Sequence, residues 1–96
     1  MAETITVESH GVTVEVDPDR LADQRFTYCL SRTADKKLAD DRKLVFHGRM
    51  LSVLFGDDDA YEVMCDLADA NGGAVSLELF DSFFTDVLEQ VGAKNS

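Results

Sequence analysis

The chain has 96 residues, of which 45% are hydrophobic and 29% are charged, a composition typical of one small globular domain. Nineteen acidic against nine basic residues give a net charge of −10. This sign argues against nucleic acid and anionic membranes as partners, because both are bound through basic surfaces. The excess of acidic residues lies mainly in the second half, since residues 44–96 carry ten acidic and only two basic side chains.

The two cysteines, Cys29 and Cys65, lie 36 positions apart, which fits neither a disulfide scaffold nor the paired spacing of a zinc site. The first ten residues lack the basic start and the apolar run of a secretory signal. No stretch approaches the ~20 apolar residues that span a bilayer. We therefore expect free thiols, a reducing cytoplasmic compartment, and a single domain over residues 1–96.

Residues 4–8 and 12–16 alternate between apolar and polar side chains, which is the period of half-buried strands. The short connection at residues 9–11 contains Gly11 and predicts a β-hairpin within residues 1–17. A lone hairpin is marginally stable in water. Its apolar face is therefore expected to pack on the helices predicted for residues 18–92.

Asp17, Pro18 and Asp19 are typical of a helix start, because Asp caps free amides and Pro suits the first helical position. We expect this helix to continue to Arg32. Residues 33–41 are polar and predict a linker to the next helix.

The segment Leu44–Phe55 is the most apolar part of the chain, with eight apolar residues in twelve. Their positions surround a helix, so this helix either lies centrally in the core or faces another molecule. Central burial is favoured, since small proteins rarely leave a large apolar patch open. Gly56 is expected to end the helix with a left-handed cap.

Three consecutive acidic residues, Asp57 to Asp59, follow. They lack the alternating acids and the Gly of a calcium-binding EF-hand loop, so we interpret them as capping and neutralising the start of the next helix. That helix is expected to end at residues 71–73, where Asn and two Gly residues allow positive φ angles.

The last predicted helix begins at Ser76 as N-cap and ends at Gly92, which leaves residues 93–96 as a disordered tail. Its apolar stripe recurs at intervals of three and four: Phe80, Phe83, Phe84, Val87, Leu88 and Val91. With about four helices and one hairpin, the sequence predicts an α+β fold that is mainly α-helical.

No motif in the sequence indicates catalysis. His10 falls in the predicted turn and His47 in the apolar helix, and neither has a nucleophile or carboxylate beside it in sequence. A pairing of His47 with Cys29 or Cys65 stays open, but no spacing favours it. Phosphate loops, metal-ligand spacings and nucleophile elbows are absent from the sequence. We therefore expect a protein that is not an enzyme and has no cofactor or metal.

The second half of the chain resembles the tail assembly chaperones of long-tailed phages and prophages. The residues that carry this resemblance are Phe55-Gly56, Tyr61, the segment from Asn71 to Ser76, Phe83-Phe84, and the segment from Gly92 to Ser96. The resemblance implies a cytoplasmic protein that binds the long, apolar, helical tape measure protein. It also implies that the protein keeps the tape measure soluble and recruits tail tube subunits.

Such chaperones commonly occur in a short form and in a longer, frameshifted form. The codons GCA AAA AAC would encode Ala93, Lys94 and Asn95 and contain the heptamer A AAA AAC, on which ribosomes slip by one base. The sequence is therefore compatible with a programmed frameshift at this point.

The expected binding mode is a partner helix in an apolar groove, offered from an acidic and soluble body. The candidate contact residues are Met50, Leu51, Leu54, Phe55, Tyr61, Phe83 and Phe84. The alternative function is an acidic adaptor or inhibitor that mimics nucleic acid and blocks a basic host protein. Salt separates the two, because binding by mimicry is lost at moderate salt whereas apolar docking persists.

Overall fold

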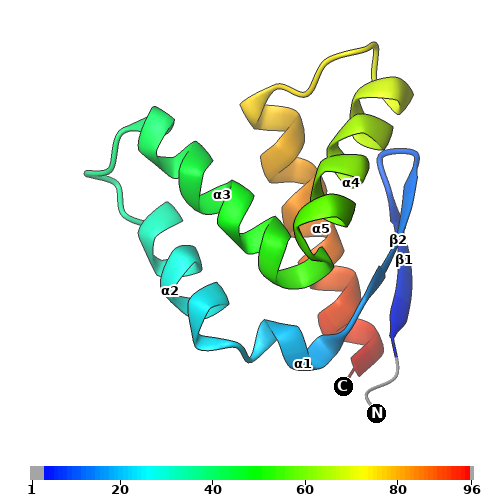
Figure 1. Ribbon diagram of the computed structural model, residues 1–96, viewed down its shortest axis with the longest axis horizontal. Coiled ribbons are helices and arrows are strands. Elements are labelled where there is room, and N and C mark those ends of the chain that lie inside the picture. Colours follow the sequence, from blue (N-terminus) through cyan, green and yellow to red (C-terminus); the bar gives the residue numbers. More distant parts are fainter. Residues whose placement is uncertain (1–3, 96) are drawn as a thin grey trace.

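A computed structural model describes residues 4–95 and shows a hairpin followed by five helices (Figure 1). This is the predicted α+β, mainly helical, single small domain. The elements are β1 (Ile5–Ser9), β2 (Val12–Val16), α1 (Pro18–Leu21), α2 (Gln24–Thr33), α3 (Asp40–Phe55), α4 (Asp57–Ala70) and α5 (Leu77–Asn95).

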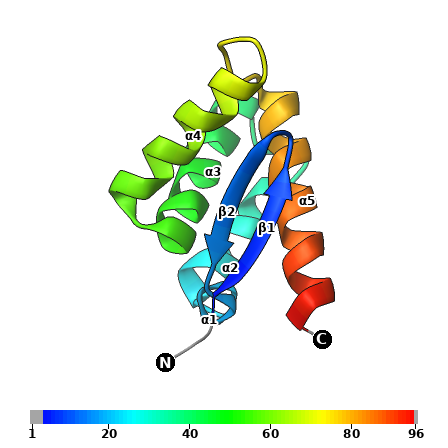
Figure 2. The same cartoon turned by 90° about the vertical axis from the view of Figure 1, so that its right-hand side faces the viewer.

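The hairpin pairs Ile5 with Val16 and Ser9 with Val12 in antiparallel register. Ser9 belongs to the strand, so only His10 and Gly11 form the turn, and both adopt positive φ angles (53° and 85°), as tight hairpin turns require. The predicted alternation is confirmed: Val7, Val12, Val14 and Val16 are all buried. The two strands lie between α4 and α5, as Figure 2 shows.

The two edges of the hairpin meet different helices. On the β1 side, α5 runs beside the strand, and its side chains donate hydrogen bonds to strand carbonyls. Gln90 Nε2 lies 2.7 Å from the Glu8 oxygen, and Lys94 Nζ lies 2.7 Å from the Thr6 oxygen. On the β2 side, a hydrogen bond joins the hairpin turn to the end of α4. Asn71 Nδ2 donates it to the His10 carbonyl at 2.9 Å.

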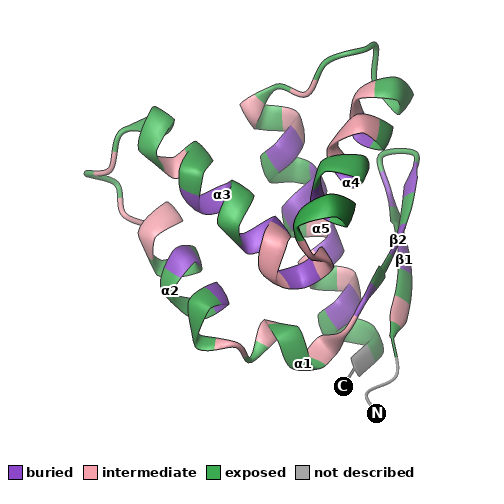
Figure 3. Ribbon diagram, in the orientation of Figure 1, coloured by how far each residue is buried: buried purple, intermediate pink, exposed green. Residues whose placement is uncertain are grey.

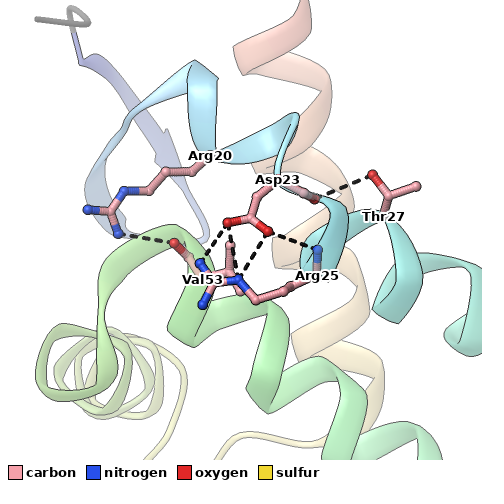
Figure 4. Close-up of polar contacts among 5 residues, drawn as sticks. All are labelled: Arg20, Asp23, Arg25, Thr27 and Val53. Carbon is pink, nitrogen blue, oxygen red and sulfur yellow. Dashed lines mark hydrogen bonds and ion pairs between the residues drawn. The ribbon is translucent and has the colours of Figure 1, made fainter.

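The predicted helix over residues 18–32 is wrong in one respect, because the chain breaks between α1 and α2. Asp23 adopts an extended conformation and accepts the backbone N–H of Arg25 at 2.8 Å, so it caps a new helix. The Arg25 guanidinium binds the same carboxylate (Figure 4), and its hydrogen bonds lower the pKa of Asp23 to about 2. The start at Asp17 is confirmed, since its side chain accepts the Asp19 N–H.

Helix α3 begins at Asp40, inside the segment predicted as a linker. Gly56 joins α3 to α4 with φ 82° and ψ 159°, a conformation that is open to glycine alone but is not the left-handed cap predicted. No side-chain hydrogen bond caps α4. Asp57 to Asp59 therefore act on its N-terminus only through their charge.

Ser76 caps α5 as predicted, because its hydroxyl accepts the Leu79 N–H at 3.1 Å. The predicted end at Gly92 is wrong, since the helix continues to Asn95. Residues 93–95 of the expected disordered tail are therefore helical, and Ser96 lies outside the described residues. Lys94, in the last turn of α5, donates a hydrogen bond to β1. Gly92 in the sequence predicts a helix end but does not reveal this tertiary contact.

The core joins the inner face of the hairpin to one face of each long helix (Figure 3). The phenyl rings of Phe80 and Phe84 stack at 5.6 Å, and Phe84 lies 6.0 Å from Phe26 of α2. Helix α3 lies centrally, with Met50 and Leu51 at 1% and 3% exposure. The predicted central burial of this helix is confirmed, although two of its residues, Leu44 and Val45, stay exposed.

Replacing Leu67 by Ala should lower the free energy of unfolding by about 2–5 kcal/mol, because removal of this fully buried side chain would leave a cavity in the core. The same change at Leu44, which is half exposed, should cost less than about 0.5 kcal/mol. Urea unfolding followed by circular dichroism measures both values. Equal losses in the two variants would contradict this description of the core.

Candidate functional site

Most of the predicted contact residues lie inside the protein. Met50, Leu51, Leu54, Phe83 and Phe84 belong to the buried core, and none is more than 6% exposed. Phe55 is half buried and packs against the core. Tyr61 is 71% exposed, and a hydrogen bond with Cys65 raises its pKa. Contact with a partner stays a prediction for Phe55 and Tyr61.

An apolar groove opens between α3, α4 and the start of α5, and we call it the α3–α5 groove. Its volume is about 150 Å³, and its lining comprises Leu44, His47, Gly48, Leu51, Met64, Val75, Ser76, Leu77 and Phe80. Four of these residues lie on α3 at spacings of three and four, so they share one helix face. Gly48 leaves open space, since a Cβ built there meets no atom within 4 Å.

His47 is the titratable side chain in the lining of this groove. Its side chain is 10% exposed, its ring stacks on Phe80 at 4.9 Å, and Nε2 lies 3.4 Å from a carboxylate oxygen of Asp81. Within residues 4–95, the buried Nδ1 atom has no hydrogen-bond partner. Burial lowers the pKa of His47 below its ordinary 6.5; Asp81 opposes this shift and Lys43 adds to it.

A second cavity, of about 360 Å³, lies on the other side of His47, between α2, α3 and α5. Its lining is mixed, with Leu30 and Leu88 beside Asp40, Lys43 and Asp81. His47 and Leu77 line both spaces. The ring of His47 therefore stands between an apolar groove and a partly charged one.

A larger groove, of about 490 Å³, runs between β2 and α4, and we call it the β2–α4 groove. Its floor is apolar, with Val14, Leu54, Phe55 and Val63, and its rim is acidic. The acidic side chains are Glu15, Asp17, Asp59, Glu62 and Asp66. Arg20 is the basic residue in the lining, and its guanidinium donates to the Val53 carbonyl at 3.1 Å (Figure 4).

Serine, histidine and aspartate also meet at the hairpin turn. Ser9 Oγ lies 2.7 Å from His10 Nδ1, and hydrogen bonds from Ser9 and Gln90 lower the pKa of Asp86. Asp86 thus binds the hydroxyl, whereas in a catalytic triad the carboxylate orients the histidine. Ser9 is moreover buried, at 4% exposure, so this cluster is not arranged to attack a substrate.

Neither metal ligation nor a membrane span is visible in the part of the chain that the structure describes. Among residues 4–95, no three His, Cys, Asp or Glu side chains are placed to hold a metal ion. No helix in this range is both long and apolar enough to cross a membrane. Cys29 and Cys65 are free thiols.

Comparison of the chain with protein-family models, with curated proteins and with solved structures finds no match.

Sequence reasoning missed both grooves. The α3–α5 groove had one visible signal, the unexplained Gly48 within a predominantly apolar helical segment. The β2–α4 groove had none, because Glu15 and the acidic residues of α4 lie more than forty positions apart and meet only when the hairpin docks on that helix.

His47 should make the stability of the fold depend on pH. Because its pKa is lowered in the fold, the unfolded chain binds more protons once the pH falls below about 6.5. The contribution of neutral His47 to the free energy of unfolding is therefore complete above this pH. It is lost as the pH falls toward the lowered pKa of His47. Urea unfolding between about pH 7.5 and 5 measures the slope.

The variant His47→Gln should flatten this slope. A free energy of unfolding that rises as the pH falls through this window, or a slope unchanged in His47→Gln, would contradict the assignment.

Proposed function

We propose that this protein is a tail assembly chaperone of a long-tailed phage or prophage and acts without catalysis. In this proposal it binds the tape measure protein in the host cytoplasm, keeps it soluble and recruits tail tube subunits. The single structural observation that supports the proposal is the apolar α3–α5 groove on a body with a net charge of −10. The resemblance of residues 44–96 to such chaperones supplies the identity of the partner.

The groove suits the side chains of an amphipathic helix. Partner helices of this kind insert residues at spacings of three and four into an apolar cleft. Leu44, Met64 and Val75 offer apolar surface at the groove, and Gly48 permits close approach of a partner backbone because it has no side chain. Leu51 remains part of the proposed contact as the buried floor of the groove.

The acidic surface serves solubility in this proposal. A large net charge keeps small proteins apart in solution while they expose apolar surface. It also disfavours nucleic acid and anionic membranes, which we do not propose as partners. A longer form made by frameshifting near Ala93 would carry the same groove.

Leu44→Asp should weaken binding of the tape measure protein at least about tenfold, because a carboxylate would lose its hydration in the apolar groove. Val45→Asp is the matched control: Val45 is similarly exposed on the same helix but is outside the groove lining. Calorimetric titration with the tape measure protein of the same phage measures both affinities. Binding by Leu44→Asp at the strength of Val45→Asp would exclude this groove as the site.

The salt dependence of the same titration separates the proposal from nucleic-acid mimicry. Apolar docking should change little between about 0.05 and 0.5 M salt, whereas a contact made by surface charges should be lost over this range. The gene offers an independent check. A slippery heptamer over the codons of residues 93–95, with an overlapping frame behind it, supports the proposal, and a gene without either argues against it.

A further inference from the structure

The two edges of the hairpin differ in whether their outward backbone groups have hydrogen-bond partners. A two-residue turn closes on a hydrogen-bonded pair, so Ser9 pairs with Val12 through both backbone groups, and hydrogen-bonded pairs then alternate along the ladder. The intervening pairs, Glu8 with Thr13 and Thr6 with Glu15, direct their N–H and C=O groups outward. The bonds from Gln90 and Lys94 to the Glu8 and Thr6 carbonyls confirm this pattern on β1.

The matching backbone groups on β2 have no such partners. Across residues 4–95, no hydrogen bond reaches the outward N–H or C=O of Thr13 or Glu15. An edge strand with unpaired groups can accept another strand. One edge of the hairpin is thus closed by α5, and the other is open.

The open edge borders the β2–α4 groove, which is lined by Thr13, Val14 and Glu15 on the strand side. On the helix side, Asp59, Glu62 and Asp66 lie at spacings of three and four and share one face of α4. Leu54, Phe55 and Val63 form the apolar floor. The contact of the turn with the end of α4, where Asn71 binds His10, closes one end of this space.

We propose that the β2–α4 groove binds an extended partner segment in which basic and apolar residues alternate, and that this segment pairs with β2 as a third strand. The proposal does not depend on the chaperone function, since it concerns another surface with another chemistry.

Charge and periodicity together select this occupant. Successive side chains of a strand point to opposite faces, so a strand added beside β2 would turn alternate residues toward the apolar floor and the others toward the acidic rim. The carboxylates of Glu15, Asp59 and Asp66 accept no hydrogen bond and form no ion pair within residues 4–95, so they are available to lysine or arginine. A helical partner would leave the outward groups of β2 unpaired.

The test uses a short acetylated and amidated peptide of alternating lysine and valine, added to the intact protein. Binding should slow amide hydrogen exchange at Thr13 and Glu15 at least about tenfold and leave Thr6 and Glu8 unchanged, as measured by nuclear magnetic resonance. The same peptide with methylated backbone nitrogens should bind at least about tenfold more weakly, since it cannot donate to β2.

A matched pair of variants tests the edge itself. Thr13→Pro removes an outward N–H of β2, and Thr6→Pro removes one of β1; proline is tolerated at such edge positions because the ladder bonds remain. Thr13→Pro should lose peptide binding at least about tenfold, and Thr6→Pro should keep it. The double variant Glu62→Gln/Asp66→Asn, which leaves the strand intact, should also weaken binding.

The proposal is overturned if the peptide does not bind, if Thr13→Pro binds as Thr6→Pro does, or if the methylated peptide binds equally well. It is also overturned if the resonance changes fall on the α3–α5 groove. If Leu44→Asp loses binding of the tape measure protein but still binds the peptide, the α3–α5 groove and the β2–α4 groove are separate binding sites.

Discussion

Burial of the inner face of the hairpin is the constraint on which the rest of the structure depends. Two strands alone are marginally stable in water, yet Val7 and Val16 are 1% and 0% exposed. This burial requires α4 at one edge and α5 at the other (Figure 2). It thereby fixes how far apart these helices stand, and the β2–α4 groove forms where the hairpin meets α4.

The two edges of the hairpin differ in how the neighbouring helix covers them. Where α5 approaches β1, polar side chains close the strand edge, and its phenylalanines fill the interior together with α3. Where α4 approaches β2, a row of carboxylates faces the strand and its backbone groups are left open. The excess of acidic residues in the second half is therefore concentrated in part at one strand edge.

The sequence predicted elements whose signals are local. The alternation of valines, the Asp17-Pro18 start and the Ser76 cap are each set by neighbours within a few residues, and the structure confirms them. The break at Asp23 was missed because this residue also fits the polar side of a continuous helix. The helix end at Gly92 was wrongly predicted because a bond between Lys94 and β1 is a tertiary contact.

The burial of the predicted contact residues also depends on tertiary contacts that local sequence signals do not reveal. A sequence indicates that Met50, Leu54 and Phe83 are apolar, but whether such residues form the core or a surface depends on which helices cover them. In this small domain the long helices bury their apolar faces against one another. The surface left for a partner is therefore set by smaller or peripheral residues, such as Gly48, Leu44 and Met64.

The ties between the first strand and the last helix span 82 and 88 positions of the chain. A ribosome makes the hairpin well before α5, so the valine face has no cover from α5 until that helix has been synthesised. Non-local contacts of this kind slow folding, because a long loop must close before they form. The contacts between β1 and α5 thus form only after α5 has been made, and until then the nascent hairpin exposes apolar surface to other molecules in its surroundings.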